Sequence, residues 1–196
     1  MADLIGLGDS TANKTITQRK FFTKNTLGEE LYFNTVDGYT GNSSRFSTNV
    51  VDGKFGIFKA MPMLNVNSKG VVSEQIRLTA ATSSLQLGQF DGLKFSSTAE
   101  YRVTPKFDKN LKKTDVAQEP RVTLKAQKGQ NSVSLVARGK YSQKNPQYAF
   151  GGGIVVLQRD FGKKVSTYLE TVLPQETFTK GQFEKANFTF GLTYKL

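Results

Sequence analysis

The sequence predicts an all-β fold: an antiparallel sandwich, jelly roll or barrel of about ten strands, with little helix. Apolar and polar residues alternate with a period of two along most of the chain, which is typical of half-buried strands. Short polar segments that contain glycine separate these runs, as turns do between antiparallel strands. The sequence does not decide among the three architectures.

The clearest alternation runs from Leu93 to Thr104 and again from Asn187 to Leu196. Between them, two alternating runs flank the segment Lys128-Gly129-Gln130-Asn131 and predict a hairpin. We expect the apolar faces of these strands to form the core, so that Phe190→Ala costs about 3–5 kcal/mol. The residues expected to be buried are Leu93, Phe95, Tyr101, Val103, Val122, Leu124, Val133, Leu135, Phe188, Phe190 and Leu192.

Local composition predicts the remaining turns and strands. The pairs Asp37-Gly38, Asp52-Gly53 and Asp91-Gly92 suit hairpin turns whose central residues take positive φ. Segment 154–157 is apolar on both faces, which predicts a central strand covered on both sides. Residues 175–186 are the best helix candidate, and 106–119 predict a long exposed loop. Further strands are expected at 16–23, 31–36, 44–50, 54–59, 74–79, 148–158 and 164–172.

The chain has 196 residues and no linker-like segment, which predicts a single β domain over residues 1–196. Its first 14 residues, 1–14, contain many polar side chains and are a candidate contact arm between subunits. The segment 1–10 lacks the pattern of a secretory signal, and no apolar run reaches the length of a membrane helix.

The chain contains no histidine and no cysteine, which removes the commonest general base, the commonest metal ligand and every thiolate. We therefore expect a protein that is not an enzyme and that has no cofactor and no small-molecule substrate. Asp160-Phe161-Gly162 matches a kinase triplet, but without the other kinase motifs it favours a turn. Gly151-Gly152-Gly153 favours a bulge or a close backbone approach, and Glu29-Glu30 favours two solvated carboxylates over a catalytic pair.

The strand from Asn187 to Leu196 has the alternation and length of a transmembrane barrel strand. It resembles the closing strand of bacterial outer-membrane barrels, although those usually end in an aromatic residue and this chain ends in leucine. This resemblance implies an outer-membrane-type barrel. The missing secretory signal and the retained Met1 argue against that hypothesis.

Three hypotheses of function remain. The first is a self-assembling structural subunit of a virus or phage particle (a coat, shell-stabilising or tail protein), located in the virion after assembly in the host cytoplasm. Its partners would be copies of itself, other particle proteins and packaged nucleic acid, with no membrane. The alternatives are the outer-membrane-type barrel and a monomeric β-sandwich that binds a ligand or hydrolyses a substrate.

The net charge of +11 favours an anionic partner. On the strands whose faces can be assigned, the polar face is mostly cationic and Glu100 is its one acidic residue. If those strands are neighbours, the cations form one patch that contacts phosphates. The residues expected to bind nucleic acid are Lys94, Arg102, Arg121, Lys125, Arg138, Lys140, Lys106, Lys109, Lys112 and Lys113.

Overall fold

A computed structural model gives the fold of the chain. It describes residues 20–34, 37–53, 56–107, 112–142, 145–175 and 186–196. Eleven strands account for most of them: β1 (Lys20–Asn34), β2 (Gly38–Asp52), β3 (Gly56–Asn67), β4 (Val72–Thr82), β5 (Leu85–Phe90), β6 (Leu93–Phe107), β7 (Lys113–Lys128), β8 (Asn131–Ser142), β9 (Asn145–Phe161), β10 (Val165–Leu173) and β11 (Asn187–Lys195).

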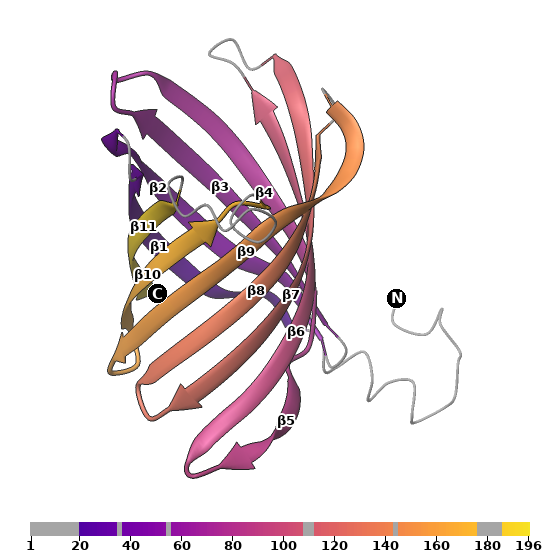
Figure 1. Ribbon diagram of the computed structural model, residues 1–196, viewed down its shortest axis with the longest axis vertical. Helices are drawn as coiled ribbons and strands as arrows, with labels where there is room; N and C mark the ends of the chain where they lie inside the picture. Colours follow the sequence, from indigo (N-terminus) through magenta and orange to yellow (C-terminus); the bar gives the residue numbers. More distant parts are fainter. Residues whose placement is uncertain (1–19, 35–36, 54–55, 108–111, 143–144, 176–185) are drawn as a thin grey trace, which may run out of the picture.

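All the strands belong to one antiparallel sheet that closes on itself. Consecutive strands pair with each other except β4 and β5; in addition, β1 pairs with β11 and β4 pairs with β6. The β4–β6 pairing closes a ring of ten strands and leaves β5 outside it, paired with β6 alone among the described strands. Figure 1 shows the resulting barrel with strongly tilted strands. The expected all-β class is therefore confirmed, and of the three architectures the barrel is correct.

Both ends of the strand-forming chain lie at the same end of the barrel (Figure 1). At that end β7 and β8 are joined by two residues, and β9 and β10 by three. Glycine takes positive φ in both turns, at Gly129 (φ 58°) and Gly162 (φ 67°). Asp91 (φ 46°) and Gly92 (φ 73°) form the predicted tight turn between β5 and β6. At the other end, residues 174–186 separate β10 from β11.

The two faces of the sheet are reversed relative to the expected core. On β11, Phe190 is 48% exposed and Leu192 is 45% exposed, whereas Thr189 is 8% exposed. On β7 and β8 the apolar face is likewise the exposed one, and Leu124 and Leu135 point outward. The alternation was identified correctly, but the predicted burial of these apolar faces is wrong. Alternation separates two faces of a strand without saying which one is inside.

The outward apolar residues form continuous rows that follow the hydrogen-bonding direction. One row crosses seven strands, with each residue directly opposite the next: Leu31, Phe190, Leu169, Leu157, Val133, Ala126 and Phe95. A row of this length on the outer wall gives the barrel an apolar belt rather than scattered exposed side chains.

Glycine apart, most of the buried residues that the structure describes are polar. Ser43, Ser47 and Asn49 on β2 have at most 5% of their surface exposed. Ile154 is 1% exposed and faces inward, but Leu157 on the same strand is 48% exposed, so segment 154–157 is not covered on both sides as expected. The inside of this barrel is thus a polar interior and not a hydrophobic core.

Three further expectations are affected by the structure. The loop expected at 106–119 is wrong, because β6 continues to Phe107 and β7 begins at Lys113. Gly152 confirms the close approach in 151–153: its φ is 94°, and an added Cβ would lie 2.1 Å from the carbonyl oxygen of Leu173. Most of the helix candidate and all of the arm 1–14 lie outside the described residues, so both stay predictions.

Within the described part of the chain, no helix is both long and apolar enough to cross a membrane.

We expect an engineered disulfide to report closure of the ring. Ala80 on β4 lies directly opposite Tyr101 on β6, and the chain has no cysteine of its own. Side chains directly opposite each other on antiparallel strands have Cβ atoms about 4.5–5.5 Å apart, within reach of a disulfide after small adjustments. The variant with Ala80→Cys and Tyr101→Cys should therefore form an intramolecular disulfide under mild oxidation, detected by mass spectrometry.

The control replaces Ala80 and Val122, which lies one strand further away on β7. That pair should remain reduced. Equal oxidation of both pairs, or none in the first, would show that β4 and β6 are not neighbours.

Candidate functional site

The inside of the barrel is a cavity of about 1000 Å³, which we call the lumen. Side chains from strands all around the ring project into it. Three of its polar groups meet on the inner wall although β10 is far from β1 and β2 in sequence: Glu30 on β1, Arg45 on β2 and Tyr168 on β10. The basic side chains that line it are Lys24, Arg45, Lys59, Arg77, Arg102, Arg121, Arg138 and Lys195, and the acidic ones are Glu30, Glu119 and Glu170.

The charge of the lumen is strongly positive. Eight basic and three acidic side chains line it, and Glu100, which contacts Arg102, adds a fourth carboxylate. Asp52, which pairs with Lys24 at 2.9 Å, adds a fifth, and basic groups still outnumber acidic ones on the inner face. Interactions between charges are stronger in such a confined space than at an open surface, because less water screens them.

Glu30 is the centre of the first ion-pair network. It is 8% exposed and accepts hydrogen bonds from Arg45 and from the Tyr168 hydroxyl on its Oε1. The Tyr32 hydroxyl (2.7 Å) and Ser43 Oγ (3.2 Å) donate to its Oε2. The carboxylate thus has a partner on each oxygen, as a buried charge requires.

Two glycines make room for this network. A Cβ added to Gly191 would lie 2.1 Å from Cζ of Tyr168, and one added to Gly28 would lie 2.7 Å from Nε of Arg45. Gly191 is directly opposite both Glu30 and Tyr168 in the sheet. The Arg45 guanidinium also lies over the Tyr168 ring, 5.4 Å from its centroid. The glycines therefore let two large side chains lie against the inner wall.

A second network occupies β6, β7 and β8. Glu119 accepts hydrogen bonds from Arg121 and, at 3.3 Å, from Nη1 of Arg138. Nε of Arg138 also donates to the carbonyl oxygen of Gly151 at 2.9 Å. On β6, Nη2 of Arg102 lies 2.8 Å from Oε2 of Glu100. Each of these three arginines therefore has at least one carboxylate partner.

Two lumen cations lack such a partner. Neither Lys59 on β3 nor Arg77 on β4 has an ion pair or a hydrogen bond to another side chain in the part of the chain that the structure describes. Both are adjacent to the second network in the sheet: Lys59 is opposite Thr79, and Thr79 is opposite Arg102. Their charges are therefore close to Arg102 and are not neutralised.

The structure divides the ten cations that we expected to bind nucleic acid. Arg102, Arg121 and Arg138 lie together as expected for neighbouring strands, but they face the lumen. Lys94 and Lys125 line a second cavity of about 580 Å³. The remaining members do not join either group: Lys112, Lys113 and Lys140 are exposed, Lys106 lies on β6, and Lys109 is outside the described residues. Contact with nucleic acid was not tested and stays a prediction.

Sequence reasoning missed the part of the site on β1 to β4. Arg45, Lys59 and Arg77 occupy inward positions on strands whose faces had not been assigned. A signal was present on β4, where Ser73, Gln75, Arg77 and Thr79 alternate with apolar or exposed residues. The pair Glu29-Glu30 also separates: Glu30 is in the lumen, while Glu29 points outward and accepts a hydrogen bond from Ser44 at 2.8 Å.

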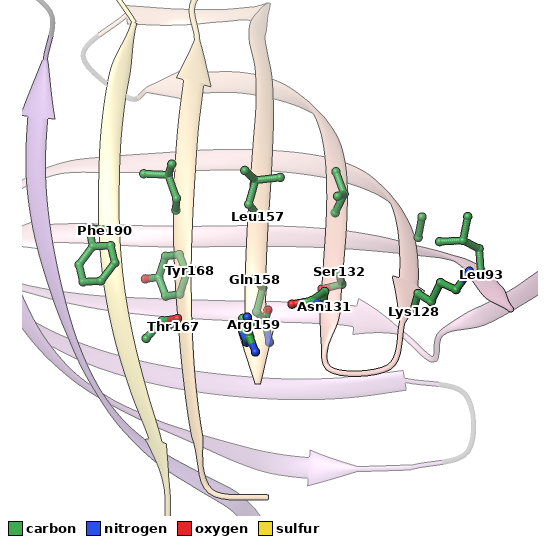
Figure 2. A pocket seen from close by; sticks show the side chains of 13 residues that line it. Leu93, Lys128, Asn131, Ser132, Leu157, Gln158, Arg159, Thr167, Tyr168 and Phe190 are labelled. Carbon is green, nitrogen blue, oxygen red and sulfur yellow. The ribbon is translucent and has the colours of Figure 1, made fainter. Parts of the chain in front are cut away.

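The outer wall has its own feature near the end that carries the termini. A groove of about 430 Å³ runs across β7 to β11 and includes Leu157, Leu169 and Phe190. Figure 2 shows the polar side chains of Arg159, Asn131 and Lys128 on successive strands along the groove. They belong to a polar row two residues closer to the termini, in which Thr167, Arg159, Asn131 and Lys128 are consecutive register partners.

Aromatic rings accompany this polar row. The Arg159 guanidinium lies 5.4 Å from the centroid of Phe161, and Nζ of Lys164 lies 5.7 Å from that of Tyr194. At the opposite end of the strands, Tyr39 and Tyr148 are exposed. The apolar belt is thus bordered by aromatic residues toward both ends.

Among the described residues, no cluster of three acidic side chains could hold a metal ion.

Solved structures provide one point of comparison. Outer membrane phospholipase A from Escherichia coli matches with 10% identity and a TM-score of 0.38, covering 86% of this chain and 89% of that one. The Salmonella typhi outer membrane phospholipase dimer with bound calcium matches with 11% identity and a TM-score of 0.37, covering 86% and 90%. No family model matches the sequence, and no curated protein matches it.

These findings correct the expected function. The prediction of a structural subunit of a virus or phage particle, with other particle proteins as partners, is contradicted: the barrel has an apolar outer wall around a charged interior, and the similar solved structures bear the name of an outer membrane phospholipase. The expected virion location and absence of a membrane are wrong for the same reason. The expectation of a protein that is neither an enzyme nor acts on a small molecule is contradicted too, since those structures are phospholipases. At this level of similarity their activity does not transfer to this chain.

Loss of the Glu30 charge should destabilise the fold strongly. Glu30→Gln leaves Arg45 buried without its carboxylate, a change that typically costs about 3–5 kcal/mol. Glu170→Gln is the matched control, because Glu170 lines the same lumen without an ion pair among the described residues. It should change the free energy of unfolding by about 0.5 kcal/mol or less. Equilibrium unfolding in urea measures both; similar costs would contradict the assigned network.

A side chain at position 191 should be unfavourable only because the Tyr168 ring occupies the same space. Gly191→Ala should cost about 1–3 kcal/mol, because its Cβ would overlap the tyrosine ring. The same substitution in a Tyr168→Ala background should cost much less. A double-mutant cycle measured by equilibrium unfolding gives the coupling. An identical cost in both backgrounds would mean that the ring does not lie over Gly191.

Proposed function

We propose that the protein is an outer-membrane-type β-barrel that spans a lipid bilayer and encloses a hydrated, positively charged lumen. The observation that carries this proposal is the orientation of the two sheet faces. A soluble barrel places its apolar residues inside, because burial from water stabilises them. Here the continuous apolar row from Leu31 to Phe95 is outside, and the lumen has ion pairs.

Strand geometry supports the same proposal. A strand tilted by about 45° needs about 9–11 residues to cross a bilayer. Each of the ten strands in the ring has at least nine residues, and the shortest are β10 and β11. The closed ring also satisfies the backbone groups of each strand on both sides, which is the condition for strands to lie in lipid.

The borders of the apolar belt are suited to the interface between lipid and water. Arg159 and Lys164 contact aromatic rings near the terminal end of the barrel. Basic and aromatic side chains are enriched where the hydrocarbon meets the headgroups. Glu29 and Ser44 lie at the end of the same polar row as Arg159, and their hydrogen bond reduces the cost of placing a carboxylate on this wall.

The test compares the stability cost of a lysine placed at two depths of the outer wall. Leu169 lies in the apolar row and Thr167 in the polar row, on the same strand and the same face. In a bilayer, Leu169→Lys should cost about 2–4 kcal/mol and Thr167→Lys about 0–1 kcal/mol. The measurement is equilibrium folding into phospholipid vesicles, with heat-modifiable gel migration as the indicator of the folded barrel.

A water-soluble barrel would behave differently. Leu169 is already 40% exposed, so a lysine there would cost little in water and the two variants would have similar stability. That result, together with a wild-type protein that stays in the aqueous phase when vesicles are added, would refute the proposal.

A further inference from the structure

We propose that the lumen binds a small phosphate-type oxyanion between Lys59, Arg77 and Arg102. This inference deepens the proposed function, because it assigns a class of ligand to the lumen of the same barrel. Basic groups outnumber acidic ones on the inner face, and the cations without a carboxylate partner are the places where an anion would bind.

The excess is concentrated on β3 and β4. In the part of the chain that the structure describes, Lys59 and Arg77 have no carboxylate within ion-pair distance, whereas Arg45, Arg121 and Arg138 each have one. Arg102 and Arg45 repel the Arg77 guanidinium, whereas Glu30 and Glu119 attract it from beyond ion-pair distance. Glu100 attracts Lys59, but Arg102, Arg45 and Lys24 repel it. An anion between these side chains would relieve the repulsion.

Sheet register places the three cations around one point. Lys59, Thr79 and Arg102 are consecutive partners on β3, β4 and β6, so the outer two Cα atoms are about 9–10 Å apart. Arg77 precedes Thr79 by two residues on the same face of β4, about 7 Å along the strand. All three side chains line the lumen and are long enough to reach a ligand in front of Thr79.

The donors and the size of the lumen define the ligand class. Guanidinium groups and an ammonium group together supply several N–H donors, which match the oxygens of a phosphate-type anion. A volume of about 1000 Å³ accommodates such an ion with water or a small organic group attached. Eleven charged side chains line the lumen, which favours a soluble anion over a lipid that would bring its acyl chains into it.

The test is isothermal titration of the folded full-length protein in detergent with inorganic pyrophosphate. The double variant Lys59→Gln/Arg77→Gln should bind at least about tenfold more weakly than the wild type, equivalent to about 1.4 kcal/mol. The control is Lys128→Gln/Arg159→Gln, which removes one lysine and one arginine from the outer wall. It should bind as the wild type does, although its net charge equals that of the lumen variant.

Three outcomes would overturn the inference: no binding to the wild type at low ionic strength, equal losses in both double variants, or unchanged affinity in the lumen variant. Heat-modifiable migration is recorded for every sample to confirm a folded barrel. If the double variant does not fold, the single variant Arg77→Gln decides, with an expected loss of about tenfold and unchanged affinity as the refuting result. Folding into vesicles is scored separately, so failure of the anion site and failure of membrane insertion are distinguishable.

Discussion

The pairing of β4 with β6 is the constraint on which the rest of the structure depends. It turns an open antiparallel sheet into a ring of ten strands, and a ring has a single inside. Once the sheet is closed, every strand must send alternate residues into that inside. The inside is occupied largely by Glu30, Arg45 and the arginines of β6 to β8, so most of the large apolar residues of the ten strands face outward. The apolar belt therefore consists of the residues that alternate along each strand with those facing the lumen.

Charged residues fill the interior only because the wall leaves space for them. Gly28 and Gly191 remove side chains from the inner face opposite Arg45 and Tyr168, and the two large groups occupy the freed volume. The network around Glu30 therefore connects β1, β2, β10 and β11, on both sides of the point where the two ends of the chain meet in the sheet. A buried network of this kind is stable only when each member has its partners, which Glu30 has.

Sequence patterns predicted the fold class, most strands and several turns, because period-two alternation and glycine in turns are local properties. They did not predict which face is inside. Phe190 and Leu192 alternate with Thr189 and Thr193 equally well in a soluble sandwich and in a barrel with an apolar exterior. The candidate site was predicted in part: Arg102, Arg121 and Arg138 were grouped correctly, since their strands are consecutive. Lys59 and Arg77 were missed because their proximity to Arg102 depends on the β4–β6 pairing, which joins strands that are not consecutive in the chain.

The inner wall shows two ways in which a fold treats buried charge. Around Glu30 the charges are neutralised by partners that the chain itself provides, and the result is structural. Around Arg77 the described residues provide no carboxylate within ion-pair distance, and Arg102 and Arg45 repel its charge. Uncompensated charge in a confined space lowers stability, so a fold tolerates it mainly where a ligand or water supplies the missing interaction. The contrast between the two regions of one lumen is therefore what separates a structural network from a binding site in this barrel.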